Sequence, residues 1–181
     1  MNNVEKSFKH LCNITKHKWY VFKYAVFCGI PWRGLVHDIS KFSPVEFCES
    51  VKFFEGDKKS PIIHAVEQQG YSLAWLHHKG RNPHHHEYWL RSLDSPDGPV
   101  PVRIQKKYLL EMLCDFLSAN KLYGNGTFES AKDFWNKRKE KITMHPESRG
   151  FLDECFRILT FWEEHHMGVR EAFYNIRQIK Y

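Results

Sequence analysis

Residues 103–123 read RIQKKYLLEMLCDFLSANKLY, and apolar side chains recur through this stretch at every third or fourth position. The recurring set is Ile104, Tyr108, Leu109, Met112, Phe116, Ala119 and Leu122. This period places the set on one face of an α-helix, and the glycines of Gly124-Asn125-Gly126 end the helix. A long helix with one apolar face predicts a domain in which helices bury such faces against one another.

The same period continues on both sides of this stretch. Ser43 is typical of an N-cap, with Pro44 at the first helical position and Glu46 three residues after the cap. Gly70 is a weak point that can divide the helix in which it lies. We expect helices at 4–28, 32–38, 44–54, 62–78, 84–93, 103–123, 128–142 and 150–166, the last continuing to residue 179 after a break at Gly168.

Loops are expected at 56–61, at the break 80–83 and at 94–101, where the sequence DSPDGPVP is rich in turn formers. Alternating strand patterns are almost absent, and there are no repeats. The predicted fold class is all-α, a helical bundle formed by one domain over residues 1–181.

Composition narrows the classes of protein. The content is 42% hydrophobic and 15% aromatic, enough apolar surface to exclude a disordered chain. No run approaches the roughly 18 apolar residues of a membrane span, and the charged start MNNVEKSFKH disfavours a signal peptide. Five scattered cysteines without a CxxC pair predict reduced thiols, mostly in the core. We therefore expect a cytoplasmic protein without a membrane partner.

The net charge of +6 suits an anionic ligand. Nucleic acid is a less favoured partner, because the lysines and arginines are spread along the whole chain rather than gathered in one patch. The sequence leaves a homo-oligomer open.

Histidine and aspartate carry the chemical signal. Val36-His37-Asp38-Ile39-Ser40-Lys41 contains an adjacent imidazole and carboxylate, which together suit one or two divalent ions such as Fe, Mn, Co, Zn or Mg. Five of the twelve histidines lie between residues 77 and 86. Asp115 lies among apolar residues on the helix 103–123, where an ionised carboxylate is costly unless it is paired or bound to metal.

The order of these residues resembles the HD-domain superfamily of metal-dependent phosphohydrolases. The resemblance implies an HD-like helical fold in which His17, His37, Asp38 and Asp115 hold one ion. It implies further that His78 and one of His84 or His85 complete a second site, with Asp38 as the bridge. The set assigned to metal is His17, His37, Asp38, His78, His84 and Asp115, and the set assigned to catalysis is Asp38, Lys41 and His85.

Longer strings refine the resemblance. HDISK is similar to the HDIGK of cyclic-dinucleotide phosphodiesterases, but Ser40 replaces glycine and no GYP-type signature follows, which disfavours a cyclic-dinucleotide substrate. HDISKFSPVEF, NPHHHEYW and EMLCDF together resemble an uncharacterised family found in bacteria and their phages. That resemblance covers a motif-bearing core at about 10–125 and leaves the C-terminal helices 128–181 without a motif.

Each assignment has a plainer alternative. His17 can be an ordinary helix histidine, and the 77–86 cluster can be an exposed metal-binding patch. His77 lies about 100° from His78 on a helix, so only one of them serves a given ion; we favour His78 and place His77 beside it or on the surface. We expect His86 to face solvent. The remaining histidines are expected to be structural or exposed; they are His10, His64, His145, His165 and His166.

Residues around the expected site also have two interpretations. Lys41 either holds a substrate phosphate or is solvated. Glu111 either orients a ligand histidine or pairs with Lys107 on the surface. Weaker candidates for phosphate contacts are Arg81, Asn82 and Arg103. Nearby aromatic residues are expected to be mainly core, with one available to stack on a base; they are Trp19, Trp32, Trp75 and Trp89.

These residues favour a metal-dependent phosphohydrolase that acts on a small phosphate ester, in particular a nucleotide. Lys41 and a histidine at 84 or 85 would steady the phosphate or protonate the leaving oxygen. Two alternatives share the same ligand list. One is a mixed-valent di-iron oxygenase of the HD superfamily, and the other is a nucleotide- or nucleic-acid-binding module with a degenerate site.

Overall fold

The structure is a computed structural model that describes residues 2–56, 59–93, 96 and 98–181. Parts of the loops expected at 56–61 and 94–101 lie outside the described residues. The elements in chain order are α1 (Asn3–Phe27), α2 (Pro31–Val36), the 3-10 helix η1 (Ile39–Phe42), α3 (Pro44–Lys52), α4 (Pro61–Gln69), α5 (Leu73–Arg81), the 3-10 helix η2 (His86–Trp89), β1 (Leu90–Arg91), β2 (Val100–Pro101), α6 (Lys106–Tyr123), α7 (Phe128–Lys139), α8 (Pro146–Glu164) and α9 (Val169–Gln178). The prediction of an all-α fold is confirmed.

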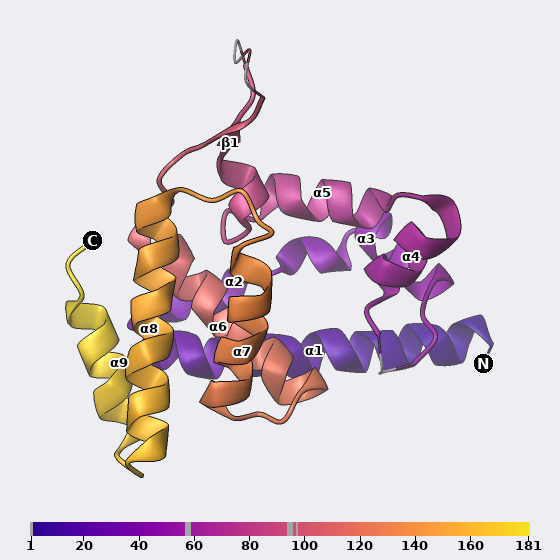
Figure 1. The fold of residues 1–181 in the computed structure, drawn as a ribbon. Coiled ribbons are helices and arrows are strands. Elements are labelled where there is room, and N and C mark those ends of the chain that lie inside the picture. Colours follow the sequence, from indigo (N-terminus) through magenta and orange to yellow (C-terminus); the bar gives the residue numbers. More distant parts are fainter. Residues whose placement is uncertain (1, 57–58, 94–95, 97) are drawn as a thin grey trace.

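Helix α1 connects the two sides of the molecule (Figure 1). It packs against α2, α3, α6 and α9. In Figure 1, α3, α4 and α5 gather beside its N-terminal half, and α6 to α9 gather beside its C-terminal half. Helix α1 therefore contacts parts of the chain that are far apart in the sequence.

The main core lies on the α6–α9 side. Leu109, Leu113, Trp135 and Phe156 are almost fully buried there, together with residues of α1 such as Val21. Cys28, Cys114 and Cys155 are buried as expected, whereas Cys48 is exposed. None of the described helices is long and apolar enough to span a membrane.

Local signals account for several helix ends. The Ser43 side chain accepts a hydrogen bond from Glu46 N at 3.4 Å, as expected of the cap of α3. Gly70 has a φ of 82°, a left-handed conformation that favours glycine, and it divides the stretch 62–78 into α4 and α5. Helix α5 then continues through Gly80, so the break expected at 80–83 begins only after Arg81.

Two predicted helices are wrong in ways that matter for the site. The helix expected at 32–38 ends at Val36, and Asp38 has a left-handed backbone with φ 52°. The helix expected at 84–93 is only η2 followed by β1, which pairs antiparallel with β2 through Leu90↔Pro101 and Arg91↔Val100. The hairpin formed by β1 and β2 projects from the body (Figure 1).

Candidate metal centre

Five separate parts of the chain contribute polar side chains to one place. Helix α1 supplies His17, the turn between α2 and η1 supplies His37 and Asp38, and α6 supplies Asp115. Helix α5 supplies His78, and the loop after it supplies His84 and His85. The structure thus brings together all the residues that the sequence assigned to metal, and it adds His85 to them.

The turn after α2 aims two of these side chains inward. His37 is extended, with φ −52° and ψ 130°, and Asp38 is left-handed, so neither continues the helix. Both side chains are buried. The Lys18 ammonium donates hydrogen bonds to the carbonyl oxygens of Leu35 (2.7 Å) and His37 (2.6 Å), which ties this turn to α1.

A first group of ligand atoms gathers on one side of Asp38. His37 Nε2 lies 3.3 Å from Asp38 Oδ2 and 3.8 Å from Asp115 Oδ1. His17 Nε2 lies 2.9 Å from the same Asp115 oxygen. Candidate ligand atoms of His17, His37 and Asp38 all lie within 4.8 Å of one another.

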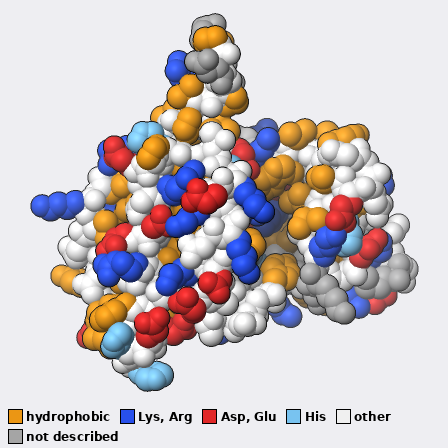
Figure 2. All heavy atoms as spheres, viewed as in Figure 1, with side chains coloured by type: hydrophobic (Ala, Val, Ile, Leu, Met, Phe, Trp, Pro, Cys, Tyr) orange, Lys and Arg blue, Asp and Glu red, His pale blue; other side chains and the backbone are white. Residues whose placement is uncertain are grey.

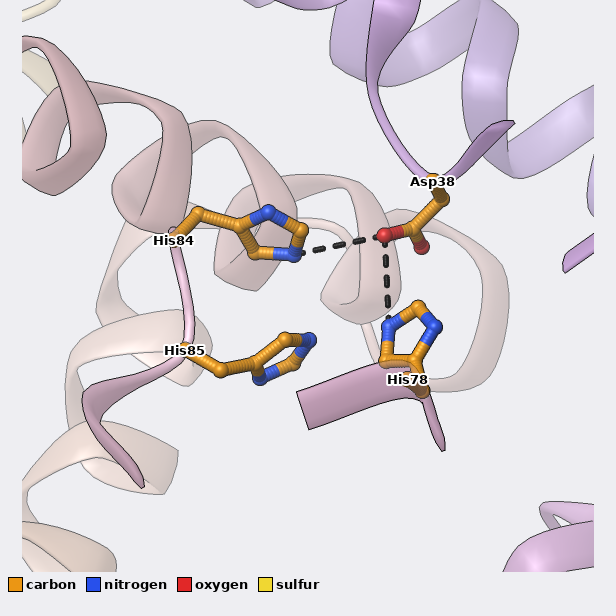
Figure 3. Close-up of side chains that lie close together, drawn as sticks. All are labelled: Asp38, His78, His84 and His85. Carbon is orange, nitrogen blue, oxygen red and sulfur yellow. Dashed lines mark ion pairs between the residues drawn. The ribbon is translucent and has the colours of Figure 1, made fainter. Parts of the chain in front are cut away.

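A second group gathers on the other carboxylate oxygen. His78 Nε2 and His84 Nε2 each lie 3.3 Å from Asp38 Oδ1, and these contacts are the dashed lines of Figure 3. The His85 ring lies beside the rings of His84 and His78 and faces the same space (Figure 3). Candidate ligand atoms of these four residues lie within 4.8 Å of one another. Asp38 therefore offers one oxygen to each group.

Most of these atoms fit a divalent cation because they have no hydrogen-bond partner among the described residues; Asp38 Oδ2 is an exception, since it pairs with Lys41 Nζ at 2.6 Å. Within the described part of the chain, the buried atoms His17 Nε2, His37 Nε2, Asp38 Oδ1, His84 Nε2 and His85 Nε2 make no hydrogen bond. The short contact of His17 with Asp115 is likewise not aligned as one. Orphaned buried polar atoms are costly, and ligands that bind one ion at about 2.0–2.2 Å lie about 3.0–3.5 Å apart. Several distances in both groups match this spacing.

Glu111 orients the first group from behind. Its Oε1 lies 3.0 Å from His37 Nδ1, and its Oε2 accepts a hydrogen bond from Arg33 Nε at 2.8 Å. With Nδ1 held in this way, the Nε2 atom of His37 faces Asp38. Glu111 is fully buried, so the alternative of a surface pair with Lys107 is wrong.

Glu46 orients the second group in the same way, and the sequence analysis did not assign this role to it. Its two carboxylate oxygens lie 2.7 Å from the Nδ1 atoms of His77 and His78. The sequence assigned Glu46 only to the start of a helix, although its place in HDISKFSPVEF was a signal for more. Asn82 joins this set, because its amide lies 2.8 Å from Ser40 Oγ and 3.2 Å from His78 Nδ1.

Electrostatics keep the carboxylates of the cluster ionised. Burial alone raises the pKa of Asp38, but His37 and Lys41 outweigh it and hold this pKa well below its usual range. Burial likewise raises the pKa of Glu111, but the hydrogen bond with His37 and the contact with His84 lower it to about 2. For His37 burial lowers the pKa, yet Asp38 and Glu111 raise it to about 9. Anionic oxygens therefore face the space where a cation would bind.

Two cavities meet at Asp115 and Ala119. One, of about 180 Å³, is lined by His17, Lys41 and His10 among others. The second, of about 230 Å³, is lined by His84, His85, Arg138 and Phe116 among others. Figure 2 shows a hollow between α7 and the α3–α4 side, with hydrophobic side chains on its floor and Lys or Arg side chains at its edge.

Several expectations for single residues need correction. The Asp115 side chain is 26% exposed because it borders both cavities, so it is not enclosed in the core. His86 is half-buried in the second cavity and does not face solvent. Arg103 pairs with Glu147 and lies over the Tyr181 ring. None of these three residues lines either of the two cavities. Trp19 and Trp32 are exposed, not core.

Lys41 is placed as its spacing from Asp38 predicts. It lies one turn of η1 after Asp38, and its Nζ is 2.6 Å from Asp38 Oδ2. Burial lowers the pKa of this ammonium, but Asp38 outweighs the effect and raises the pKa above its usual value. A charged lysine at the cavity wall agrees better with anion binding than with a solvated side chain.

Comparison with known proteins gives a family but no activity. No curated protein and no solved structure matches the chain. Residues 6–158 match a family of unknown function (DUF5662), a range that includes every residue of the two ligand groups. Since the match covers most of the chain, this protein is a member of that family.

Proposed function

We propose that this protein is a metal-dependent phosphohydrolase of the HD type, which binds two divalent ions and hydrolyses a small phosphate ester, with nucleotides as the leading class. One observation carries the proposal. The two oxygens of Asp38 face two separate sets of histidine nitrogens, and most of those nitrogens have no hydrogen-bond partner among the described residues.

Each ligand has a proposed place. His17, His37, Asp38 and Asp115 would hold one ion, and Asp38, His78, His84 and His85 would hold the other. Ions bound there supply a nucleophilic water at neutral pH and polarise the phosphoryl group. We assign His85 to ligation, because a ring nitrogen of His85 lies within 4.8 Å of the candidate ligand atoms of Asp38, His78 and His84, and its Nε2 has no hydrogen-bond partner among the described residues.

The cavity walls support a phosphate ester with an apolar organic group. Lys41 lines one cavity and Arg138 lines the other, so both can neutralise charge that develops on a phosphoryl oxygen. Trp75, Met112 and Phe116 line the second cavity beside His84 and His85. A planar base would find apolar and aromatic surface there, which a sugar phosphate would not use.

The test joins metal content with turnover. Protein purified without chelator should contain a divalent metal, and it should release phosphate anaerobically from members of a nucleotide panel with Mn²⁺, Co²⁺ or Mg²⁺. We expect Asp38→Ala to abolish turnover and Lys41→Ala to lower kcat/KM by about 10²-fold. The control is Asp133→Ala, which removes an exposed carboxylate of α7 and should leave turnover unchanged.

Other outcomes would replace the proposal. Turnover that requires iron and dioxygen would favour the oxygenase alternative. A metal-free protein without activity on any phosphate ester would favour a binding module, which equilibrium dialysis with nucleotides would then reveal.

A further inference from the structure

Helix α1 carries two apolar faces, and only one of them is buried. The buried face contains His10, Ile14, His17, Val21 and Ala25 and meets the core and the candidate metal centre. The second face, called here the outer stripe, consists of Val4, Phe8, Leu11, Thr15, Trp19, Phe22 and Val26. All of these except the half-buried Phe22 are exposed, Phe8 by 66% and Trp19 by 57%.

The outer stripe has the same spacing in both directions from Thr15. Leu11 and Trp19 lie four positions on either side, Phe8 and Phe22 lie seven, and Val4 and Val26 lie eleven. The hydroxyl of Thr15 donates a hydrogen bond to the carbonyl oxygen of Leu11 at 2.9 Å. Thr15 thus has its donor satisfied and can lie against another apolar surface.

Helix α2 extends one half of the outer stripe into a groove. A Cβ on Gly34 would lie 2.5 Å from the Ala25 Cβ, so this glycine lets α2 approach α1 closely. The result is a groove of about 270 Å³ lined by Thr15, Lys18, Trp19, Phe22, Gly34 and Leu35. Trp32, one turn before Leu35 on α2, is 68% exposed.

We propose that the outer stripe is an interface with a second copy of this chain, formed by antiparallel pairing of two α1 helices about Thr15. In this arrangement, Phe8 and Leu11 of each copy lie opposite Phe22 and Trp19 of the other. The side chains of Phe8 and Leu11 from one copy therefore enter the groove beside α2 of the second copy. The exchange is reciprocal, as a two-fold axis requires.

The exposed apolar area fits this occupant. At about 200 Å² for an exposed aromatic residue, Phe8, Trp19 and Trp32 alone offer about 400 Å². With Val4, Leu11, Val26 and Leu35, the surface reaches the order of 800 Å² that a stable interface takes from each partner.

Cysteine cross-linking tests the register directly. In a Cys12→Ser/Cys48→Ser background, which removes the partly and fully exposed thiols, Thr15→Cys should form a covalent dimer on mild oxidation. Facing residues on the two-fold axis can reach disulfide distance. Val4→Cys alone should stay monomeric on a denaturing gel, whereas a mixture of Val4→Cys and Val26→Cys proteins should cross-link. Cross-linking of Val4→Cys alone with equal yield would indicate parallel pairing and would overturn the proposal.

Solution mass provides the second arm. Sedimentation equilibrium of the unmodified chain at tens of micromolar should give twice the chain mass, and Phe8→Glu or Trp19→Glu should give the monomer with unchanged far-UV circular dichroism. The matched control is Leu76→Glu, which alters an exposed leucine of α5 outside the outer stripe. A monomeric unmodified chain, or a dimer lost only in Leu76→Glu, would contradict this interface.

Discussion

Asp38 has the most constrained backbone of the candidate site. Its φ of 52° and ψ of 29° lie in the left-handed region, which costs most L-residues about 1–2 kcal/mol and costs Asp and Asn less. Lys41 offsets this cost twice, because its backbone N–H donates to the Asp38 carbonyl at 3.0 Å and its ammonium pairs with the carboxylate. Asp38 thus lies between the two candidate ligand groups and also forms the left-handed turn between α2 and η1.

Substitution can separate the two roles of Asp38. We expect Asp38→Asn and Asp38→Ala to lose bound metal alike, because neither keeps an anionic ligand. Asp38→Ala should in addition be less stable than Asp38→Asn by about 1 kcal/mol, since asparagine tolerates the left-handed conformation. Metal analysis and urea unfolding of the metal-free proteins measure the two effects. Equal stability of both variants would show that the backbone conformation carries no cost.

The carboxylates behind the histidines should matter for metal affinity. Glu46→Gln and Glu111→Gln remove the anion that holds Nδ1 of His78 and of His37, respectively. Each change should weaken metal binding about 10- to 100-fold, measured by competition with a chromophoric chelator. Glu154→Gln is the control, because Glu154 pairs with Arg157 on the surface of α8. An effect of the control as large as that of Glu46→Gln would contradict the assigned role.

At the scale of elements, the short helix α2 depends on its neighbours. It has six residues, and its N-cap makes no side-chain hydrogen bond. Its position is set by the close approach of Gly34 to Phe22 and Ala25, and its end is held by the ammonium of Lys18. Because His37 follows α2 directly, the packing of this helix positions the first ligand group.

A methyl group on Gly34 should therefore disturb the site from a distance. We expect Gly34→Ala to destabilise the protein by about 1–3 kcal/mol through overpacking and to lower metal content, measured by thermal unfolding and metal analysis. The control is Gly150→Ala in α8, where a Cβ would meet no described atom within 4 Å. That change should instead stabilise the protein by about 1 kcal/mol, since alanine is the better helix former. A neutral Gly34→Ala would show that α2 can move without cost.

At the scale of the molecule, burial of ionisable groups between the two sides predicts a response to acid. His10 of α1 packs beside the rings of Phe47 and Phe54 on the α3 side. Burial and the neighbouring Lys41 lower the pKa of His10 to about 4. The folded protein therefore favours the neutral imidazole of His10, and protonation of this buried ring in acid destabilises the fold.

This depressed pKa fixes the sign of a pH effect. The contribution of neutral His10 to stability is present above pH 6.5, the usual value, and is lost as pH falls toward about 4. Relative to His10→Leu, the unmodified chain should lose up to about 3 kcal/mol of unfolding free energy across this window. Urea unfolding with a chelator present measures both curves. Parallel curves would show that His10 keeps its ordinary pKa.

The sequence by itself determined the helical class and most helix positions, because the signals are local. Apolar period, the cap at Ser43 and the left-handed Gly70 act within a few residues of the ends they define. The resemblance also indicated the histidines and aspartates that the structure brings together, since a motif lists residue types in order. These features do not require knowledge of which helices meet.

Only the tertiary structure decided the rest, because it depends on contacts between distant parts of the chain. Residues 84–93 leave the helical pattern where Trp89 Nε1 donates to the Pro83 carbonyl and β1 pairs with β2, which leaves His84 and His85 free to reach Asp38. Glu46 becomes a partner of His78 only because α3 packs on α5. Trp19 is 57% exposed on a face of α1 that the described elements cover only in part, although its local pattern is that of a core residue. A helix period shows that a face is apolar, but only packing shows what that face meets.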